Sequence, residues 1–198
     1  MKKIKGFTMI ELLIVIAVLG ILAVAVLAAI NPIEQINRGR DTGSRSDAEQ
    51  LLSAIDRYNA SQMIWPWQCV SDSTKDYDTF RLVDDTWTEY TDGTGCSTSC
   101  PVLEKLSVAT TPGCSGTEEI KQSFVDRITD TRYNNLYVYF EGGPGTSVYV
   151  CFNPQSGSFR DEAIRRCTEG EPADLVGSGA CGSCPKDAGT GDDCICLP

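Results

Sequence analysis

Residues 1–30 read MKKIKGFTMIELLIVIAVLGILAVAVLAAI, the most apolar stretch of the chain. Residues 7–30 form an apolar run whose only charge is Glu11, and the 19 residues 12–30 carry no ionisable side chain. A helix of that length spans about 28 Å, close to the hydrocarbon core of a bilayer, and satisfies its own backbone hydrogen bonds in lipid. Basic residues before such a helix favour a cytoplasmic amino end. The chain therefore predicts one membrane pass with the remainder outside, oriented by Lys2, Lys3 and Lys5.

The junction between the lysines and the apolar run carries a recognisable motif. Gly6 and Phe7 are followed by Thr8-Met9-Ile10-Glu11 and then by the long apolar segment. This order resembles the type IV prepilin family, in which a short basic leader ends in Gly and is followed by Phe, Thr-x-Ile-Glu and an apolar helix. The resemblance implies that a prepilin peptidase cuts between Gly6 and Phe7 and methylates the new amino group of Phe7.

Two other interpretations of the apolar segment remain open. One is a plain membrane anchor. The other is a secretory signal peptide cleaved near Ala23–Ala25. The signal peptide is the poorer match, because its apolar region usually has about 7–15 residues, whereas this one is longer and begins with an acid.

Glu11 is the residue that most distinguishes this segment from an ordinary anchor. A carboxylate near the start of a membrane helix is costly to insert, so it usually has a function and a partner. Glu11 lies four residues after Phe7, on the same helical face. Cleavage would give Phe7 a cationic amine, and in pilins such an amine is thought to pair with the acid of a neighbouring subunit and set the axial stagger of a filament. The alternative is a Glu11 that only reaches toward the headgroups.

Composition limits the other functions that the chain can have. Its 198 residues suffice for one modest globular domain beside the membrane segment. The formal charge is −10, and removal of the three leader lysines takes it to about −13, so we expect no nucleic-acid partner. The absence of histidine removes the commonest general base and metal ligand. We therefore predict a protein that is not an enzyme and has no cofactor.

All ten cysteines follow the apolar segment, on the side predicted to be extracytoplasmic. An even number in an oxidising compartment predicts up to five disulfides, and the pairing stays open. The candidates are Cys69, Cys96, Cys100, Cys114, Cys151, Cys167, Cys181, Cys184, Cys194 and Cys196.

Metal chemistry in the tail is a less favoured alternative. The last four cysteines, from Cys181 to Cys196, have the residue type of a four-thiolate zinc site, although the second spacing is tighter than usual. Cys181 and Cys184 also have the spacing of a redox dithiol, without the strand–helix–strand context of such sites. Carboxylates suited to calcium, without a recognisable ligand spacing, are Asp187, Asp192 and Asp193. Disulfides are favoured, and we predict no metal.

The apolar helix contains Gly20, and Pro32 follows it. Pilins often have a glycine at this point and a helix-breaking proline about eight residues later, and the helix between them can melt during assembly. Here the proline comes twelve residues later, which leaves the melted span open. Because proline lacks an N–H, Pro32 predicts at least a kink.

Residues 33–60 predict an amphipathic helix, weakened by Gly39 and Gly43. Its polar face carries acids and Arg57, and we expect its apolar stripe to pack under a globular head, with a flexible stalk as the alternative. The stripe comprises Ala48, Leu51, Leu52, Ile55 and Tyr58.

The remaining residues predict a small sheet held by loops and disulfides. Trp65-Pro66-Trp67 ends the helix, and two tryptophans there favour packing of the head. Residues 69–117 predict a long connection stapled by its four cysteines, with a short helix at 101–108, and a second short helix is predicted after it at 118–128. Residues 133–141 and 146–152 predict a hairpin. Residues 157–167 predict a third strand, with a helix over 161–166 as the alternative. A Gly- and Asp-rich tail from about residue 168 depends on disulfides for its shape.

Together these features predict an α+β, pilin-like fold: a long N-terminal helix on a small antiparallel sheet, with a disulfide-rich C-terminal region. The expected segments are a leader (1–6), a membrane and filament-core half-helix (7–30), an amphipathic half-helix (31–60) and a head (61–198).

The resemblance implies the structural subunit of a type IV pilus-like filament that serves adhesion, motility or uptake. It implies a single-pass protein of the cytoplasmic membrane that becomes an extracellular homopolymer, with a prepilin peptidase, an assembly ATPase and a membrane platform as partners. The alternatives are a pseudopilin of type II secretion and a tethered binding module that does not polymerise.

Overall fold

The computed structural model describes residues 6–29, 31–68, 77–88, 100–130, 132–143, 145–182, 184 and 193–198. The chain divides into two compact units, Met1–Ile36 and Asn37–Pro198. The first contains helix α1 (Met9–Ala29) and the start of helix α2 (Pro32–Gln62), and the second contains the rest of α2 and the globular head.

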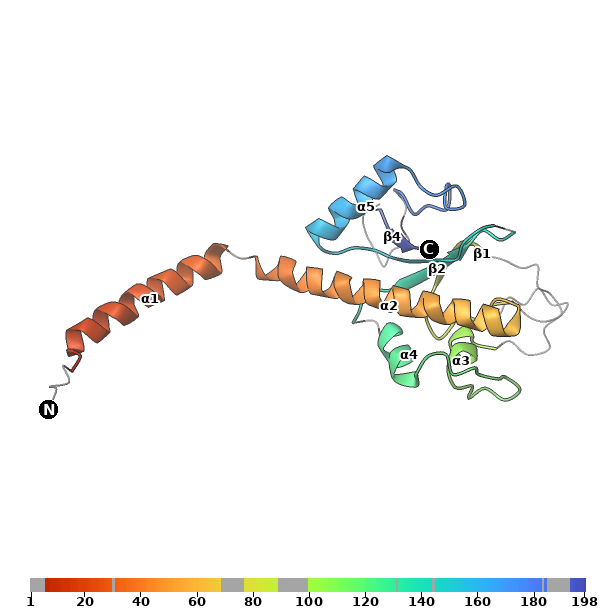
Figure 1. The fold of residues 1–198 in the computed structure, drawn as a ribbon, viewed down its shortest axis with the longest axis horizontal. Coiled ribbons are helices and arrows are strands. Elements are labelled where there is room, and N and C mark those ends of the chain that lie inside the picture. The colour runs from red at the N-terminus through yellow and green to blue at the C-terminus, as the bar shows by residue number, and fades with distance from the viewer. Residues whose placement is uncertain are drawn as a thin grey trace. The chain divides into compact units, whose positions relative to one another are not determined.

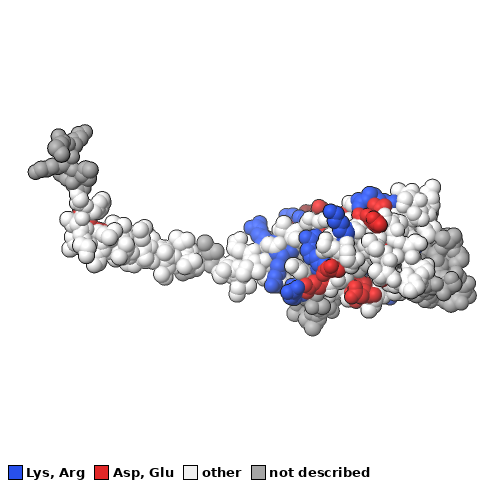
Figure 2. Space-filling view, turned by 90° about the horizontal axis from the view of Figure 1, so that it is seen from below, with Lys and Arg blue, Asp and Glu red and all other residues white. Residues whose placement is uncertain are grey.

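Helix α1 is apolar on every side, and Figure 2 shows it as an almost unbroken surface of uncharged residues. Its large apolar side chains range from 47% exposed at Val15 to 88% at Met9. Within the described part of the chain it is the one helix long and apolar enough to cross a membrane, over Met9–Leu27. A helix that is apolar all round is suited to lipid or to the interior of a helix bundle.

The helix is interrupted between α1 and α2, where the sequence predicts a kink. The side chain of Asn31 accepts a hydrogen bond of 3.4 Å from the backbone N–H of Glu34, so Asn31 caps α2. Pro32 then occupies the first helical position, where its missing N–H costs nothing. The break therefore starts a new helix. Gly20 lies inside α1, and α2 continues through Gly39 and Gly43 without interruption.

One face of α2 is buried in the head, as the spacing of its apolar residues predicts. The buried residues include all of the predicted stripe except Leu52, which is partly buried. Removing each large apolar side chain from water contributes about 1.5–3 kcal/mol to the stability of the folded head. Three buried residues were not predicted: Asp41 and Ser44 extend the stripe toward the amino end of α2, and Ala54 lies within it.

The head is built on a four-stranded antiparallel sheet of order β1-β2-β3-β4 (Figure 1). Its strands are β1 (Tyr77–Leu82), β2 (Leu136–Phe140), β3 (Tyr149–Phe152) and β4 (Ile195–Leu197). The predicted hairpin is β2 and β3, which pair Leu136 with Phe152 and Tyr139 with Tyr149. This arrangement confirms the α+β fold.

The structure decides one open alternative and corrects two segments predicted as loop. Residues 157–167 lie in helix α5 (Gly157–Glu169), so the helical alternative is confirmed and the third strand is not formed there. The additional strands come from segments predicted as loop, β1 from the long connection and β4 from the tail. Both were missed for physical reasons: β1 is an edge strand whose pairing with β2 is irregular between Tyr77 and Arg81, and β4 has only three residues.

Each face of the sheet is covered by a different part of the chain. On one face, Leu136, Val138 and Val150 join the apolar stripe of α2 in the main core. On the other face, Tyr139, Tyr149 and the buried cysteines pack against Leu175 and Ala180 of the C-terminal segment. Successive residues of a strand point to opposite faces of the sheet, so burial of both faces explains why every residue of β2 and β3 is buried.

Two short helices and the tryptophans complete the core. The predicted short helices appear as α3 (Val102–Leu106) and α4 (Gln122–Ile128). Trp67 is fully buried and stacks with Trp65 at 5.6 Å between ring centroids, while Phe140 of β2 lies 5.8 Å from Trp67. The tryptophans after α2 therefore fasten that helix to the sheet.

Candidate processing and assembly site

The first turn of α1 is closed by reciprocal hydrogen bonds between Thr8 and Glu11. The backbone N–H and the hydroxyl of Thr8 donate to Oε2 of Glu11 at 2.8 and 2.7 Å, and the backbone N–H of Glu11 donates to Oγ1 of Thr8 at 3.3 Å. This is a capping box, in which the side chains at the helix start satisfy the N–H groups that have no partner within the helix.

The capping box explains how Glu11 can sit at the start of an apolar helix. Its carboxylate meets two donors of its own chain, which offsets part of the cost of placing it in lipid. Both donors bind Oε2, so Oε1 remains outside the cap. A cation from another molecule can therefore approach the carboxylate without displacing Thr8.

Thr8 had no predicted role, although its spacing from Glu11 in the sequence indicates a capping box. A Thr followed three residues later by Glu, before an apolar run, is the pattern of a capping box. Glu11 and Phe7 lie where the sequence predicts them, at the amino end of α1. The pairing of Glu11 with the amine of a neighbouring Phe7 concerns two chains and stays a prediction.

The predicted cleavage point lies just before the helix. Gly6 and Phe7 precede α1 and are exposed, with Phe7 83% exposed. A peptidase must hold an extended backbone in its active site, and residues outside a helix can adopt that conformation without unfolding a turn. The geometry is therefore compatible with cleavage between Gly6 and Phe7, while the capping box keeps α1 closed immediately behind it.

Eight of the ten cysteines form four disulfides in the head. Cys69 and Cys96 lie outside the described residues. The pairs are Cys100–Cys114, Cys151–Cys196, Cys167–Cys181 and Cys184–Cys194. Of the last four cysteines, Cys184 and Cys194 bond to each other, Cys181 bonds to Cys167 and Cys196 bonds to Cys151. Neither a four-thiolate zinc site nor a Cys181–Cys184 dithiol fits this pairing.

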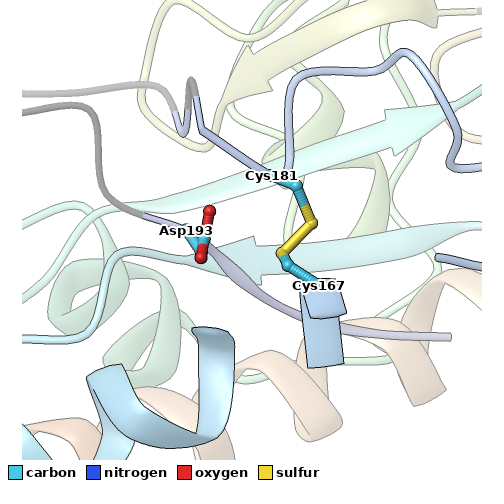
Figure 3. Close-up of side chains that lie close together, drawn as sticks. All are labelled: Cys167, Cys181 and Asp193. Carbon is cyan, nitrogen blue, oxygen red and sulfur yellow. A yellow bond between two sulfur atoms is a disulfide. The ribbon is translucent and has the colours of Figure 1, made fainter. Parts of the chain in front are cut away.

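Figure 3 shows the one group of described residues that resembles a metal site. Cys167, Cys181 and Asp193 lie close together, but the two sulfur atoms are bonded to each other. A thiolate is the form of cysteine that binds metal, so this disulfide offers no charged ligand. Asp193 instead accepts a hydrogen bond of 2.7 Å from the N–H of Gly182. Of the three carboxylates considered for the calcium alternative, Asp187 and Asp192 lie outside the described residues.

The C-terminal segment is also fastened to the sheet by Asp174. Its carboxylate accepts hydrogen bonds of 2.7 Å from the N–H of Ser147 and from the hydroxyl of Tyr149. Burial and the hydrogen bond to Asp174 raise the pKa of Tyr149 to about 12. Partial burial acts to raise the pKa of Asp174, but the two hydrogen bonds outweigh it and lower that pKa.

A polar groove of about 740 Å³ runs between α2 and the segment of α4. Two ion pairs bridge its walls, Arg57 with Glu119 at 2.8 Å and Arg127 with Asp47 at 2.5 Å. Burial raises the pKa of Asp47, and the nearby charge of Arg127 offsets only part of that rise. The groove contains no histidine or cysteine, so it offers neither a Ser–His pair nor a thiolate. Its residues serve to hold α4 against α2.

One comparison with known proteins gives a match. A family model described as the prokaryotic N-terminal methylation motif matches residues 1–27. The matched residues include Gly6, Phe7, the Thr8–Glu11 capping box and most of α1. The matching family is not a catalytic one. No curated protein and no solved structure matches the chain.

Proposed function

We propose that this type IV pilin- or pseudopilin-like protein, which carries the prokaryotic N-terminal methylation motif at residues 1–27, is the structural subunit of a type IV pilus-like extracellular filament. It is made as a prepilin in the inner membrane, cleaved between Gly6 and Phe7, methylated on Phe7 and polymerised. The motif implies a prepilin peptidase and an assembly machinery. We propose that this machinery comprises a cytoplasmic ATPase and a membrane platform.

The observation that carries this proposal is the combination of an all-round apolar helix with one acid at its start. A single-pass anchor needs only apolar residues, and within one chain the capping box offsets only part of the energy that inserting the acid costs. In a filament the same helix is buried among copies of itself, where dispersion contacts replace those with lipid. The acid then has a partner, because each neighbouring copy brings a cationic amine at Phe7.

The geometry at Glu11 supports this role. Thr8 holds one carboxylate oxygen, and the second points outside the cap. An ion pair with the amine of an adjacent copy would form in a medium of low dielectric, where opposite charges attract strongly. Because the subunits repeat, the same pair fixes the same axial step for each addition. The head, stapled by four disulfides, then forms the outer surface.

The test uses the full-length prepilin expressed in cells that contain a prepilin peptidase and an assembly system. Wild type, Glu11→Ala and Glu49→Ala are compared, because Glu49 is an exposed acid of α2 and serves as the matched control. We expect all three to yield mature protein that begins at methylated Phe7 by mass spectrometry. Wild type and Glu49→Ala should give fibres in sheared fractions and electron micrographs, and Glu11→Ala should give none.

Two results would contradict the proposal. Fibres formed by Glu11→Ala at the wild-type level would leave the acid without a role in assembly and would favour a tethered module. Protein that still begins at Met1 in cells with normal fibres would remove the processing step. A deletion strain separates the pseudopilin alternative, because loss of protein export with no loss of surface fibres would assign the chain to type II secretion.

A further inference from the structure

Two arginines near the start of α2 differ from most of the other basic residues that the structure describes. Most of the described Lys and Arg side chains form ion pairs or hydrogen bonds, as Arg45 does with Glu162 and Arg57 with Glu119. The charged groups of Arg38 and Arg40 have no partner among the described residues, and both side chains are exposed. Two free cations this close together are unexpected in a chain whose formal charge is −10.

The acids nearest to these arginines in sequence do not neutralise them. Asp41 follows Arg40 directly, but its carboxylate is fully buried and accepts hydrogen bonds from Gln155 and Ser156. Glu34 stands four residues before Arg38, and no ion pair joins the two. Figure 2 shows Lys and Arg side chains gathered toward the end of the globular unit where α2 enters it.

Chain length places both arginines close to a membrane that contains α1. The uncharged run ends at Ile30, and α2 rises about 1.5 Å per residue from Pro32. The Cα atoms of Arg38 and Arg40 therefore lie at most about 16 and 19 Å from the end of that run, whatever the direction of α2. Helical side chains lean toward the amino end of their helix, which here is the end joined to α1, and an arginine reaches about 6 Å.

This reach matches the thickness of the membrane surface. Each headgroup layer is about 5–7 Å deep, and the attraction of a charged surface extends about 8 Å farther at physiological salt. The guanidinium groups fall within that combined range. The large apolar residues of the same stretch, Ile33 and Ile36, are 68% and 58% exposed, as suits a segment that lies at a lipid interface.

We propose that Arg38 and Arg40 bind anionic phospholipid headgroups of the leaflet at the carboxyl end of α1. This inference rests on the membrane-inserted prepilin of the proposed function and adds a lipid partner to it. Arginine can bind a phosphate through two parallel N–H···O hydrogen bonds, which suits it to this ligand. The contact holds the base of the head at the membrane surface before assembly, and it must be released when the subunit leaves the bilayer.

The test measures which lipids surround the full-length protein. The protein is reconstituted into phosphatidylcholine bilayers that contain traces of spin-labelled phosphatidylglycerol or phosphatidylcholine, and electron paramagnetic resonance gives the fraction of each label held at the protein. Wild type is compared with the double variant Arg38→Gln/Arg40→Gln and with Lys121→Gln. Lys121 is an exposed cation of the head with no partner among the described residues, so its variant controls for the loss of a positive charge at another site. The leader lysines are present in every sample.

We expect the preference for phosphatidylglycerol over phosphatidylcholine to be at least about three-fold smaller in the double variant than in wild type, and Lys121→Gln to match wild type. Salt near 1 M, where the Debye length is about 3 Å, should shrink the difference. Equal preference in wild type and double variant would overturn the inference, as would an equal loss in Lys121→Gln.

Resistance to alkaline extraction shows whether the protein is inserted in the membrane, so it separates failure of the lipid inference from failure of the proposed function. Wild-type protein that does not insert would overturn both proposals, whereas inserted protein with no lipid preference overturns only this one. If the double variant loses its fibres but keeps the wild-type lipid preference, Arg38 and Arg40 belong to a contact between subunits, and the lipid assignment is wrong.

Discussion

The carboxylate of Asp41 accepts two hydrogen bonds from Ser156, one from its backbone N–H at 2.7 Å and one from its hydroxyl at 2.6 Å. Ser156 is the residue that precedes α5, and its own side chain does not cap that helix. The side-chain amide of Asn134 and the N–H of Gln155 also donate to Asp41, each at 3.0 Å. A charged residue of α2 therefore fixes the start of α5 and the approach to β2 from inside the core.

Removing this carboxylate should destabilise the head strongly. Asp41→Ala leaves several buried donors without an acceptor, so we expect the free energy of unfolding to fall by about 2–4 kcal/mol. Urea unfolding of the full-length protein in detergent, followed by tryptophan fluorescence, measures the loss. Asp161→Asn, an exposed acid of α5, is the matched control and should change stability by less than about 0.5 kcal/mol. Similar values for the two variants would refute the role given to Asp41.

A double-mutant cycle tests whether the effect passes through Ser156. The hydroxyl of Ser156 contacts Asp41, so the cost of Ser156→Ala should shrink when Asp41 is already alanine. We expect a coupling energy above about 0.5 kcal/mol. Additive effects would mean that the two residues stabilise the head independently.

The capping box at the start of α1 gives a second prediction. Thr8→Val keeps the shape of the side chain but removes the hydroxyl that donates to Glu11 and accepts from its N–H. Loss of a cap costs about 0.5–2 kcal/mol of helix stability, and it leaves the carboxylate less well oriented. We expect fewer fibres from Thr8→Val, with cleavage unchanged, and recovery with Thr8→Ser. Equal amounts of fibre from all three proteins would show that Thr8 does not orient Glu11.

The elements that could be predicted from the sequence are those with a strong periodic signal. In each of these elements one chemical type of side chain recurs at a regular spacing. They are the uncharged run of α1, the stripe of Ala48, Leu51 and Ile55, and the alternating residues of the β2–β3 hairpin. Asp41 was missed, although it continues the stripe with the same three- and four-residue spacing, through Ser44. The role of a polar residue on an apolar helix face becomes clear only when the groups that donate hydrogen bonds to it are known.

The missed strands show the same limit. The residues of β1, YDTFRL, alternate in polarity over a short distance and border a Ser- and Asp-rich segment, so the pattern is too weak to separate a strand from a loop. The three residues of β4 become a strand only because β3 lies beside them, paired through Val150 and Leu197. The disulfide pairing likewise depends on which segments the fold brings together.

The disulfides should contribute different amounts to the free energy of unfolding, according to the length of the loop that each one closes. Cys151–Cys196 spans 45 residues and Cys184–Cys194 spans 10. In the chain-entropy account the longer loop contributes more, about 4 kcal/mol against about 3 kcal/mol. Urea unfolding of the paired serine variants should therefore show the larger loss for Cys151→Ser/Cys196→Ser. The reverse order would mean that the C-terminal loop depends on its own short bridge more than on its attachment to the sheet.

The last prediction concerns the pH dependence that Asp174 and Tyr149 give to the head. The pKa of Asp174 is lowered in the folded state, so its contribution to stability is present above about pH 4 and is lost as the pH falls through the folded pKa. The pKa of Tyr149 is raised to about 12, so its contribution is present below about pH 10 and is lost as the pH rises toward 12. Between these limits the contact should contribute constant stability.

Tyr149→Phe removes the donor to Asp174 and should lower the free energy of unfolding by about 0.5–1.5 kcal/mol at neutral pH. The difference from wild type should vanish above pH 12. Carbon-13 NMR of the tyrosine rings measures the titration directly, and Asp174→Asn should move the pKa of Tyr149 from about 12 toward the ordinary value of 10.0. A Tyr149 that titrates near pH 10 in the wild-type protein would show that Asp174 does not hold it, and that the C-terminal segment is attached to the sheet by its disulfides and apolar contacts instead.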